Sequence, residues 1–361
     1  MCVYGIPDIG IAKGIEPLLS TRLKDFSIYR FMKISVAVIT YNQQETIRQT
    51  IDSILMQKGD FQLELVIGED CGTDNTLEIC KEYECKFPDV VRVLPNTHNL
   101  GIMANYARTE LACSGDFVAD IAGDDYYIDD HALEKQMRYM LAHPEVGVMA
   151  SNGCRYYVRR NKFVEGLNPT VTSENDGAKQ FYFNSDYKGG VYFKPVGMMV
   201  RRELFQYVDF DEIIRRKLPV EDYPMQAIFS QHTHFACLPD LLVTYRIYKE
   251  SATFLSIDHP KYLEYHKGLM DTRRYLNELF PEDACFSEKQ MQEYAFYKEY
   301  LLYLHCLNYK SAKELLKSNK DVIGDGAKFN QAEKFTQSRL SFFMFHIYKE
   351  FVRIKEIKHN T

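Results

Sequence analysis

Three acidic sites in the sequence carry the side chains whose types and spacing could do chemistry. The first is the adjacent pair Asp124 and Asp125, which follows the apolar run FVADIA. Neighbouring carboxylates repel each other unless a positive charge lies beside them. Carboxylate oxygens are the ligands that Mg²⁺ and Mn²⁺ prefer, and these cations keep open positions for substrate phosphates. The pair could therefore hold a divalent cation that neutralises a departing nucleotide diphosphate, although such pairs also occur in turns and helix caps.

The other two acidic sites suggest a nucleotide contact and a general base. Asp70 ends the apolar run LVIG-Glu, where its carboxylate could accept the N3–H of a uracil. Glu221 and Asp222 stand in LPVEDYPM, and a carboxylate there could take a proton from an acceptor hydroxyl. The structural alternatives are a helix cap for Asp70 and a solvated turn for the second pair. The turn Thr40-Tyr41-Asn42 adds polar groups for a base or ribose.

The elements that would position these groups alternate between strands and helices. Apolar runs at 34–40, 63–68, 90–94, 116–122 and 146–150 alternate with segments of helical apolar period, such as 101–111. Asn42 and Glu45 resemble a capping box at the start of the first helix. This order predicts a mostly parallel sheet covered by helices, in which ligands bind at the carboxyl ends of the strands. The polar residues fall at these strand ends.

Composition divides the chain and limits its class. We expect an N-terminal extension at 1–31, an α/β domain at 32–258 and a helical C-terminal region at 259–361, with 151–195 forming a long loop. Within the α/β domain we expect two halves, 32–150 and 151–258, which the resemblance described next implies to be the donor-binding and the acceptor-side half. The net charge of −6 argues against nucleic-acid binding. Nine scattered cysteines without a CxxC pair indicate reduced thiols in the cytoplasm, and no apolar run suggests a signal peptide or a membrane span.

The order and spacing of these motifs resemble family 2 glycosyltransferases of the GT-A fold. The resemblance is specific from Ile34 to about Met149, through SVAVITYNQQETIRQTIDSILMQ, ELVIGEDCGTDNT, NLGIMANYA and GDFVADIAGDDYY. It continues more loosely through VEDYPM and LPDLLVTYRIYKESAT. It implies an inverting, metal-dependent transfer of a sugar from a nucleotide-sugar, with UDP favoured by Asp70, to a glycan or lipid-linked acceptor in polysaccharide assembly.

The resemblance also assigns roles to single residues. It implies Asp222 as the catalytic base and Asp125, with Asp124, as ligands of Mn²⁺ or Mg²⁺. It implies that the substrate-binding residues are Thr40, Tyr41, Asn42, Asp70, Asn99, Gly101, Asn105, Asp124, Glu221, Tyr245 and Arg246. Tyr248 stands where the family often has a histidine, which puts a metal contact from that position in doubt.

Other functions are weighed against this one. A sugar-phosphate nucleotidyltransferase needs a glycine-rich basic loop after the first strand, and a nicotinamide dehydrogenase needs GxGxxG there; the sequence has TYNQQETI. A non-catalytic sugar-nucleotide binder keeps the same fold, but the three intact acidic sites argue against it. The basic, aromatic helix expected at 343–358 could lie on the inner face of a membrane, or it could pack on its own domain.

Overall fold

The computed structural model describes residues 32–172, 178–183, 192–248, 257, 260–284 and 286–359, with side chains up to Val352 except that of Gln180. The expected extension 1–31 lies outside the described residues. The centre of the fold is a nine-stranded mixed sheet with the order β3-β2-β1-β4-β8-β6-β9-β5, to which β7 adds by pairing with β6. The strands are β1 (Lys33–Thr40), β2 (Gln62–Glu69), β3 (Val91–Pro95), β4 (Phe117–Ala122), β5 (Tyr126–Tyr127), β6 (Val146–Tyr157), β7 (Lys162–Glu165), β8 (Met198–Arg201) and β9 (His234–Ile247).

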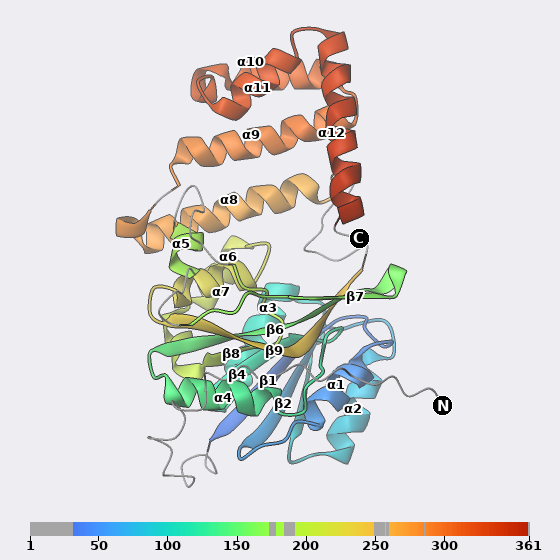
Figure 1. Ribbon diagram of the computed structural model, residues 1–361, viewed down its shortest axis with the longest axis vertical. Coiled ribbons are helices and arrows are strands. Elements are labelled where there is room, and N and C mark those ends of the chain that lie inside the picture. Colours follow the sequence, from blue (N-terminus) through green and yellow to red (C-terminus); the bar gives the residue numbers. More distant parts are fainter. Residues whose placement is uncertain are drawn as a thin grey trace, which may run out of the picture.

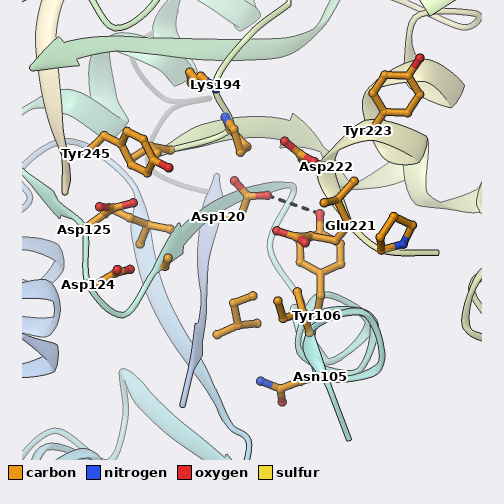
Figure 2. Close-up of a pocket in the computed structure, with 18 of the residues that line it drawn as sticks. Asn105, Tyr106, Asp120, Asp124, Asp125, Lys194, Glu221, Asp222, Tyr223 and Tyr245 are labelled. Carbon is orange, nitrogen blue, oxygen red and sulfur yellow. Dashed lines mark hydrogen bonds between the residues drawn. The ribbon is translucent and has the colours of Figure 1, made fainter. Parts of the chain in front are cut away.

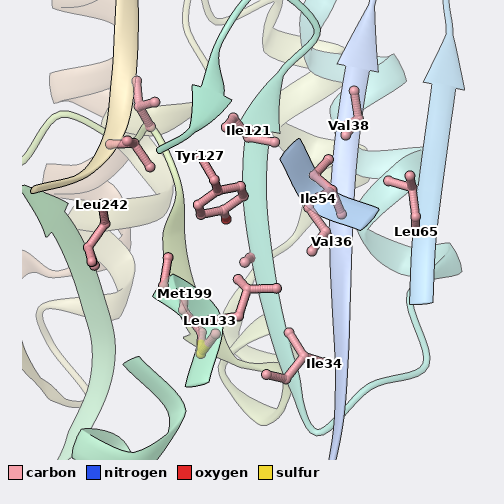
Figure 3. Packing of buried hydrophobic residues seen from close by; sticks show 14 of the residues in the cluster. Ile34, Val36, Val38, Ile54, Leu65, Ile121, Tyr127, Leu133, Met199 and Leu242 are labelled. Atoms are coloured by element: carbon pink, nitrogen blue, oxygen red, sulfur yellow. The ribbon is translucent and has the colours of Figure 1, made fainter. Parts of the chain in front are cut away.

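The part of the sheet formed by β1, β2, β3 and β4 is parallel. β1 pairs in parallel with β2 and β4, and β2 pairs in parallel with β3. Their sequences are nearly continuous apolar runs because both faces of the sheet are covered. Ile34, Val36 and Val38 of β1 pack into one cluster with residues such as Ile54 and Ile121 (Figure 3). The carboxyl ends of β1, β2 and β4 therefore meet at one edge, as the sequence predicts.

Helices cover the two faces of the sheet and place different side chains there. α1, α2 and α4 pack on the face that carries Ile34, whereas α3, α6 and α7 pack on the opposite face. The helices are α1 (Ile47–Leu55), α2 (Thr76–Lys86), α3 (Ile102–Ala112), α4 (Ala132–Ala142), α5 (Ala178–Phe183), α6 (Phe210–Arg216) and α7 (Asp222–Phe229). This arrangement of sheet and helices is the GT-A architecture that the sequence predicts.

A helical region follows the sheet domain and lies beyond α5 and α6 (Figure 1). It consists of α8 (Tyr262–Leu279), α9 (Glu288–His305), α10 (Tyr309–Ile323), α11 (Ala327–Phe335) and α12 (Arg339–His359). α8 joins the core of the sheet domain through Tyr275 and Leu276, whereas α9 to α12 share a core of their own around Tyr300 and Phe342. No helix among the described residues combines the length and apolar character needed to cross a membrane.

Two local predictions are wrong. Asn42 does not start a helix: its φ is 52°, α1 begins five residues later, and its side chain accepts a hydrogen bond from the Thr73 amide (2.7 Å). Asn42 thus joins two loops. The stretch 151–195 is not one long loop either, because β6 continues to Tyr157 and pairs with β7 and β9. This strand is only partly buried beyond Gly153, so its sequence there is rich in Gly, Asn and Tyr and lacks the apolar pattern that predicts a strand.

Candidate active site

A large pocket lies at the carboxyl edge of the parallel strands. Its volume is about 640 Å³, and strand ends, α3, α7 and the first two helices of the C-terminal region line it (Figure 2). Its polar and charged lining residues include Thr40, Tyr41, Gln43, Asp70, Asn105, Tyr106, Glu110, Asp120, Asp124, Asp125, Tyr192, Lys194, Glu221, Asp222, Tyr223, Tyr245, Arg246, Tyr265, Arg273 and Tyr294. All three acidic sites of the sequence therefore face one cavity.

Asp124 and Asp125 stand in the tight turn after β4. A Cβ on Gly123 would lie 2.6 Å from Thr40 Oγ1, so only glycine lets this turn approach the loop after β1 so closely. Thr50 of α1 fixes the turn from behind by donating to the backbone oxygen of Asp125 (2.7 Å). The backbone of the turn thus places both aspartates at the pocket.

Arg246 of β9 gives this pair partial charge compensation. Its amide donates to Asp125 Oδ1 (2.7 Å), and its guanidinium donates to the Asp124 backbone oxygen and to Gln49, above the ring of Tyr126. Burial nevertheless raises the pKa of Asp125 well above its usual value, and the neighbouring Asp124 charge adds to this. Burial raises the pKa of Asp124 as well. Two hard carboxylates with uncompensated charge fit a divalent cation.

Asp70 organises the loop before α3. Its carboxylate accepts hydrogen bonds from the amides of Leu100 and Gly101 (2.7 and 2.9 Å) and from Asn96 Nδ2 (2.8 Å). Gly101 can take this place because its φ of +83° is unfavourable for other residues. Two carboxylate oxygens can accept about four hydrogen bonds, so one position remains for a ligand. Asp70 is thus part of the loop and part of the pocket wall.

Glu221 and Asp222 form the second acidic pair, at the start of α7. The Tyr192 hydroxyl donates a hydrogen bond to Asp222 Oδ2, and the positive charge of Lys194 lies close enough to act on Asp222. Burial raises the pKa of Asp222, and Tyr192 and Lys194 partly reverse this. Burial, together with the charge of Asp222, raises the pKa of Glu221 to about 7.

Two further carboxyl groups line the pocket, and neither belongs to the residues predicted from the sequence. Glu110 of α3 is only 2% exposed, and neither of its oxygens has a hydrogen-bond partner among the described residues. Oδ1 of Asp120, in β4, is also buried without a partner, while its Oδ2 lies 3.4 Å from the Tyr106 hydroxyl. Burial raises the pKa of both carboxyl groups. The sequence signal was present, because Asp120 interrupts an apolar strand and Glu110 stands in the apolar stripe of α3.

One other acidic cluster could hold a metal by geometry. Ligand atoms of Asp129, Asp130 and His131 lie within 4.8 Å of one another, and no other such group of three occurs in the described part of the chain. However, Lys135 pairs with Asp129 (2.6 Å) and Lys58 with Asp130. The positive charges of these lysines already balance the partly exposed carboxylates, so the cluster is a weaker candidate for a metal site than the pair in the pocket.

The structure brings together most of the residues that the sequence singles out. Lining the pocket are Thr40, Tyr41, Asp70, Asn105, Asp124, Asp125, Glu221, Asp222, Tyr245 and Arg246. Asn42, Asn99 and Gly101 are not among the lining residues but shape the neighbouring loops. Gln43, Tyr192, Lys194 and Arg273 line it without having been predicted. The last of these comes from α8, in the helical region.

The parallel sheet, with its acidic residues at the carboxyl edge, has the GT-A architecture. Residues 35–208 match the family model described as "Glycosyl transferase family 2". An uncharacterized protein of Mycobacterium tuberculosis is 36% identical over 115 residues, which are 32% of this chain and 33% of that protein. The poly(ribitol-phosphate) β-N-acetylglucosaminyltransferase TarS of Staphylococcus aureus is 33% identical over 115 residues, or 28% and 19% of the two chains.

A solved structure gives the same result for the fold. TarS residues 1–349 in complex with UDP-GlcNAc superpose with a TM-score of 0.51 at 17% identity, covering 75% of this chain and 73% of that one. The chain spans about a third of the length of the curated relatives that it matches first. The family-model match over residues 35–208 and the similarity to TarS together support a family 2 glycosyltransferase.

Proposed function

We propose that the protein is an inverting, metal-dependent glycosyltransferase that moves a sugar from a nucleotide-sugar, with UDP the favoured nucleotide, to a hydroxyl group. The observation that carries this proposal is the shared pocket, which holds an acidic pair beside Arg246 and a second pair beside Lys194. The first pair suits a cation and a diphosphate. The second suits an acid–base reaction, and the sugar would lie between them.

The proposed step is one displacement at the anomeric carbon. Asp222 accepts the proton of the acceptor hydroxyl as its oxygen forms a bond to the anomeric carbon. The bond from that carbon to the diphosphate oxygen breaks, and the diphosphate leaves with the electron pair. A divalent cation held by Asp124 and Asp125 would neutralise this developing charge. Because only one displacement occurs, the configuration inverts and no covalent sugar–enzyme bond forms.

Asp222 is the better base of its pair for a physical reason. Tyr192 and Lys194 favour its charged form, whereas the pKa of about 7 leaves Glu221 largely protonated below neutral pH. A base must be ionised to accept a proton. Glu221 is therefore proposed as a substrate-binding group whose neutral carboxyl donates a hydrogen bond.

The nucleoside end is proposed to contact the loops after β1 and β2. Thr40, Tyr41 and Asp70 line that end, and Asp70 keeps one acceptor position for the N3–H of a uracil. Support for UDP comes from TarS, whose structure was solved with UDP-GlcNAc and with UDP. Asn105, which also lines the pocket, connects α3 to β2 because its side chain donates a hydrogen bond to the Gly68 backbone oxygen (2.8 Å).

The experiment is a screen for nucleotide release. The protein is incubated with UDP-, GDP- and dTDP-sugars in the presence of Mn²⁺ or Mg²⁺, and the released nucleoside diphosphate is measured with and without EDTA. Release that depends on the metal supports the proposal. Binding without any release favours a non-catalytic sugar-nucleotide binder, and formation of pyrophosphate from a nucleoside triphosphate and a sugar phosphate favours a nucleotidyltransferase.

We further propose that α12 contacts an anionic membrane surface, where a lipid-linked glycan acceptor would be found. One face of this helix is apolar and exposed; its members are Leu340, Phe343, Met344, Ile347, Tyr348 and Phe351. From Arg339 to the end, the chain has five Lys and Arg but only two Glu. Apolar side chains with surrounding basic charge are what an interfacial helix needs to bind anionic lipids. This proposal implies a cytoplasmic protein at the inner face of a membrane.

Flotation with vesicles tests this contact. The full chain should float with vesicles of equal phosphatidylcholine and phosphatidylglycerol but not with phosphatidylcholine alone. Phe343→Glu with Ile347→Glu should abolish flotation, whereas Val322→Glu, an exposed apolar position on α10, should not. If the wild type instead stays in solution and elutes as a dimer that the double variant dissociates, a second copy covers the helix and the membrane proposal is wrong.

A further inference from the structure

Asp120 occupies the centre of the pocket and has no role in the reaction proposed so far. Its neighbours in β4, Ala119 and Ile121, point into the core on the α1 side, so Asp120 points to the opposite face. Figure 2 places its carboxyl group between Asp125 on one side and Glu221 and Asp222 on the other. The first pair suits the diphosphate and the second the acceptor, so Asp120 lies where the transferred sugar must be.

The carboxyl group of Asp120 is unusually short of hydrogen-bond donors. Oδ1 is buried and has no partner among the described residues, and the single contact of Oδ2 is a long one to Tyr106. Behind it, both oxygens of the buried Glu110 lack partners as well. A buried acceptor without a donor lowers the stability of the fold, because its contact with water is lost and nothing replaces it. Such a cost is retained where a ligand supplies the missing hydrogen bonds.

The geometry decides which ligand these carboxyl groups can take. Within the described residues, Asp120, Glu110 and Glu221 do not form a group whose oxygens all lie within 4.8 Å, as a shared metal would need. Sugar hydroxyls make no such demand, because each can donate to one carboxylate oxygen at its own distance. A ligand with several separate O–H donors therefore fits the floor better than a single cation does.

We propose that Asp120 is the floor of the donor-sugar subsite and accepts hydrogen bonds from hydroxyl groups of the sugar ring. This inference rests on the proposed glycosyl transfer and adds a specificity. Asp120, Glu110 and Glu221 are three largely buried acidic side chains that line this pocket. Burial disfavours the charged forms of these carboxyl groups, and it disfavours the charged carboxylate of a uronic acid in the same way, so a neutral pyranose is selected.

The test compares dissociation constants for UDP, UDP-glucose, UDP-galactose, UDP-GlcNAc and UDP-glucuronate, measured by titration calorimetry with Mn²⁺. The informative quantity is the ratio of the constant for the UDP-sugar to that for UDP. In the wild type this ratio is lowest for a neutral sugar and highest for glucuronate. Asp120→Ala should raise the ratio for the preferred neutral sugar about tenfold, which corresponds to the loss of one hydrogen bond between the sugar and the protein. It should leave UDP binding unchanged.

Two controls keep the outcome clear. Asp120→Asn preserves the shape of the side chain and one acceptor oxygen, so it should keep most of the preference for the neutral sugar, while Asp116→Ala, an exposed aspartate just before β4, should change no ratio. Unchanged UDP binding shows that a variant is folded. If Asp120→Ala leaves the ratios as in the wild type, or weakens UDP and UDP-sugars equally, the sugar subsite is wrong. If the wild type binds no nucleoside diphosphate or nucleotide-sugar at all, the proposed function itself fails.

Discussion

The two acidic pairs of the pocket have nearly the same composition but opposite surroundings. Asp124 and Asp125 lie in a turn, where the amide of Arg246 donates to Asp125 and the guanidinium of Arg246 lies beside the turn. Glu221 and Asp222 lie at the start of a helix, where a tyrosine hydroxyl donates to Asp222 and a lysine is close. The first pair is fixed through backbone atoms, and the second through side chains that can exchange protons.

This difference separates the two chemistries that a sugar transfer needs. A cation site requires carboxylates that stay in place while charge builds up on the leaving group. A base requires a carboxylate whose proton affinity its neighbours can tune. Identical residue types can therefore serve different functions, and the sequence pattern ED or DD alone does not say which.

The largest effect is expected when the proposed base, Asp222, loses its ability to accept a proton. Asp222→Asn keeps the shape of the side chain but cannot accept the acceptor's proton, so kcat for sugar transfer should fall about a thousandfold. The dissociation constant for UDP with Mn²⁺ should remain near that of the wild type. Asp211→Asn, an exposed carboxylate of α6, is the matched control. Normal turnover in Asp222→Asn would mean that the base lies elsewhere.

A smaller loss of turnover is expected when the proposed cation site, Asp124 and Asp125, loses one charged ligand. Asp125→Asn removes one charged ligand, so turnover at a fixed Mn²⁺ concentration should fall about a hundredfold, as when one group that stabilises developing charge is removed. Unlike Asp222→Asn, this variant should also bind UDP less tightly when Mn²⁺ is present. Asp129→Asn, in the partly exposed cluster of Asp129, Asp130 and His131, should behave as the wild type. If Asp129→Asn shows the metal defect instead, the cation site has been assigned to the wrong cluster.

The sequence predicted the strand-end residues because their positions follow from local order. In a parallel sheet, residues that end successive strands must share an edge, so Asp70 and Asp124 could be placed together without a structure. Family likeness then pointed to Asp222, which no local rule connects to the others. The fold was predictable for the same reason, since continuous apolar runs and helical periods alternate along the chain.

The residues that escaped prediction depend on packing between distant segments. Tyr192 and Lys194 stand in a stretch without period, and only the approach of α7 brings them to Asp222. Arg273 and Tyr265 come from α8, beyond the recognisable motifs, yet they line the pocket. A boundary near residue 258 therefore marks a change in sequence character but not the limit of the pocket.

A third test uses pH to sharpen the contrast between Glu221 and Asp222. The pKa of Glu221 is about 7 in the folded protein and close to its ordinary value when unfolded, so the folded state holds the proton more tightly. The free energy of unfolding should therefore fall as the pH rises from about 4.5 to 7, by at most about 1.4 kcal/mol per unit. Urea unfolding of wild type and Glu221→Gln at several pH values measures this. Glu221→Gln should flatten the slope; an equal slope in both would place the titrating group elsewhere.

The smallest expected effect concerns Glu110, the buried carboxyl group of α3 that lines the pocket. Glu110→Leu replaces a partnerless buried carboxyl by an apolar side chain of similar size and should raise the free energy of unfolding by about 1 kcal/mol at pH 7. Glu78→Leu, on the exposed face of α2, should change it by less than about 0.5 kcal/mol. Thermal unfolding followed by circular dichroism gives both values. A destabilised Glu110→Leu would show that Glu110 supports the fold, whereas a stabilised one would mark it as a group retained for its ligand.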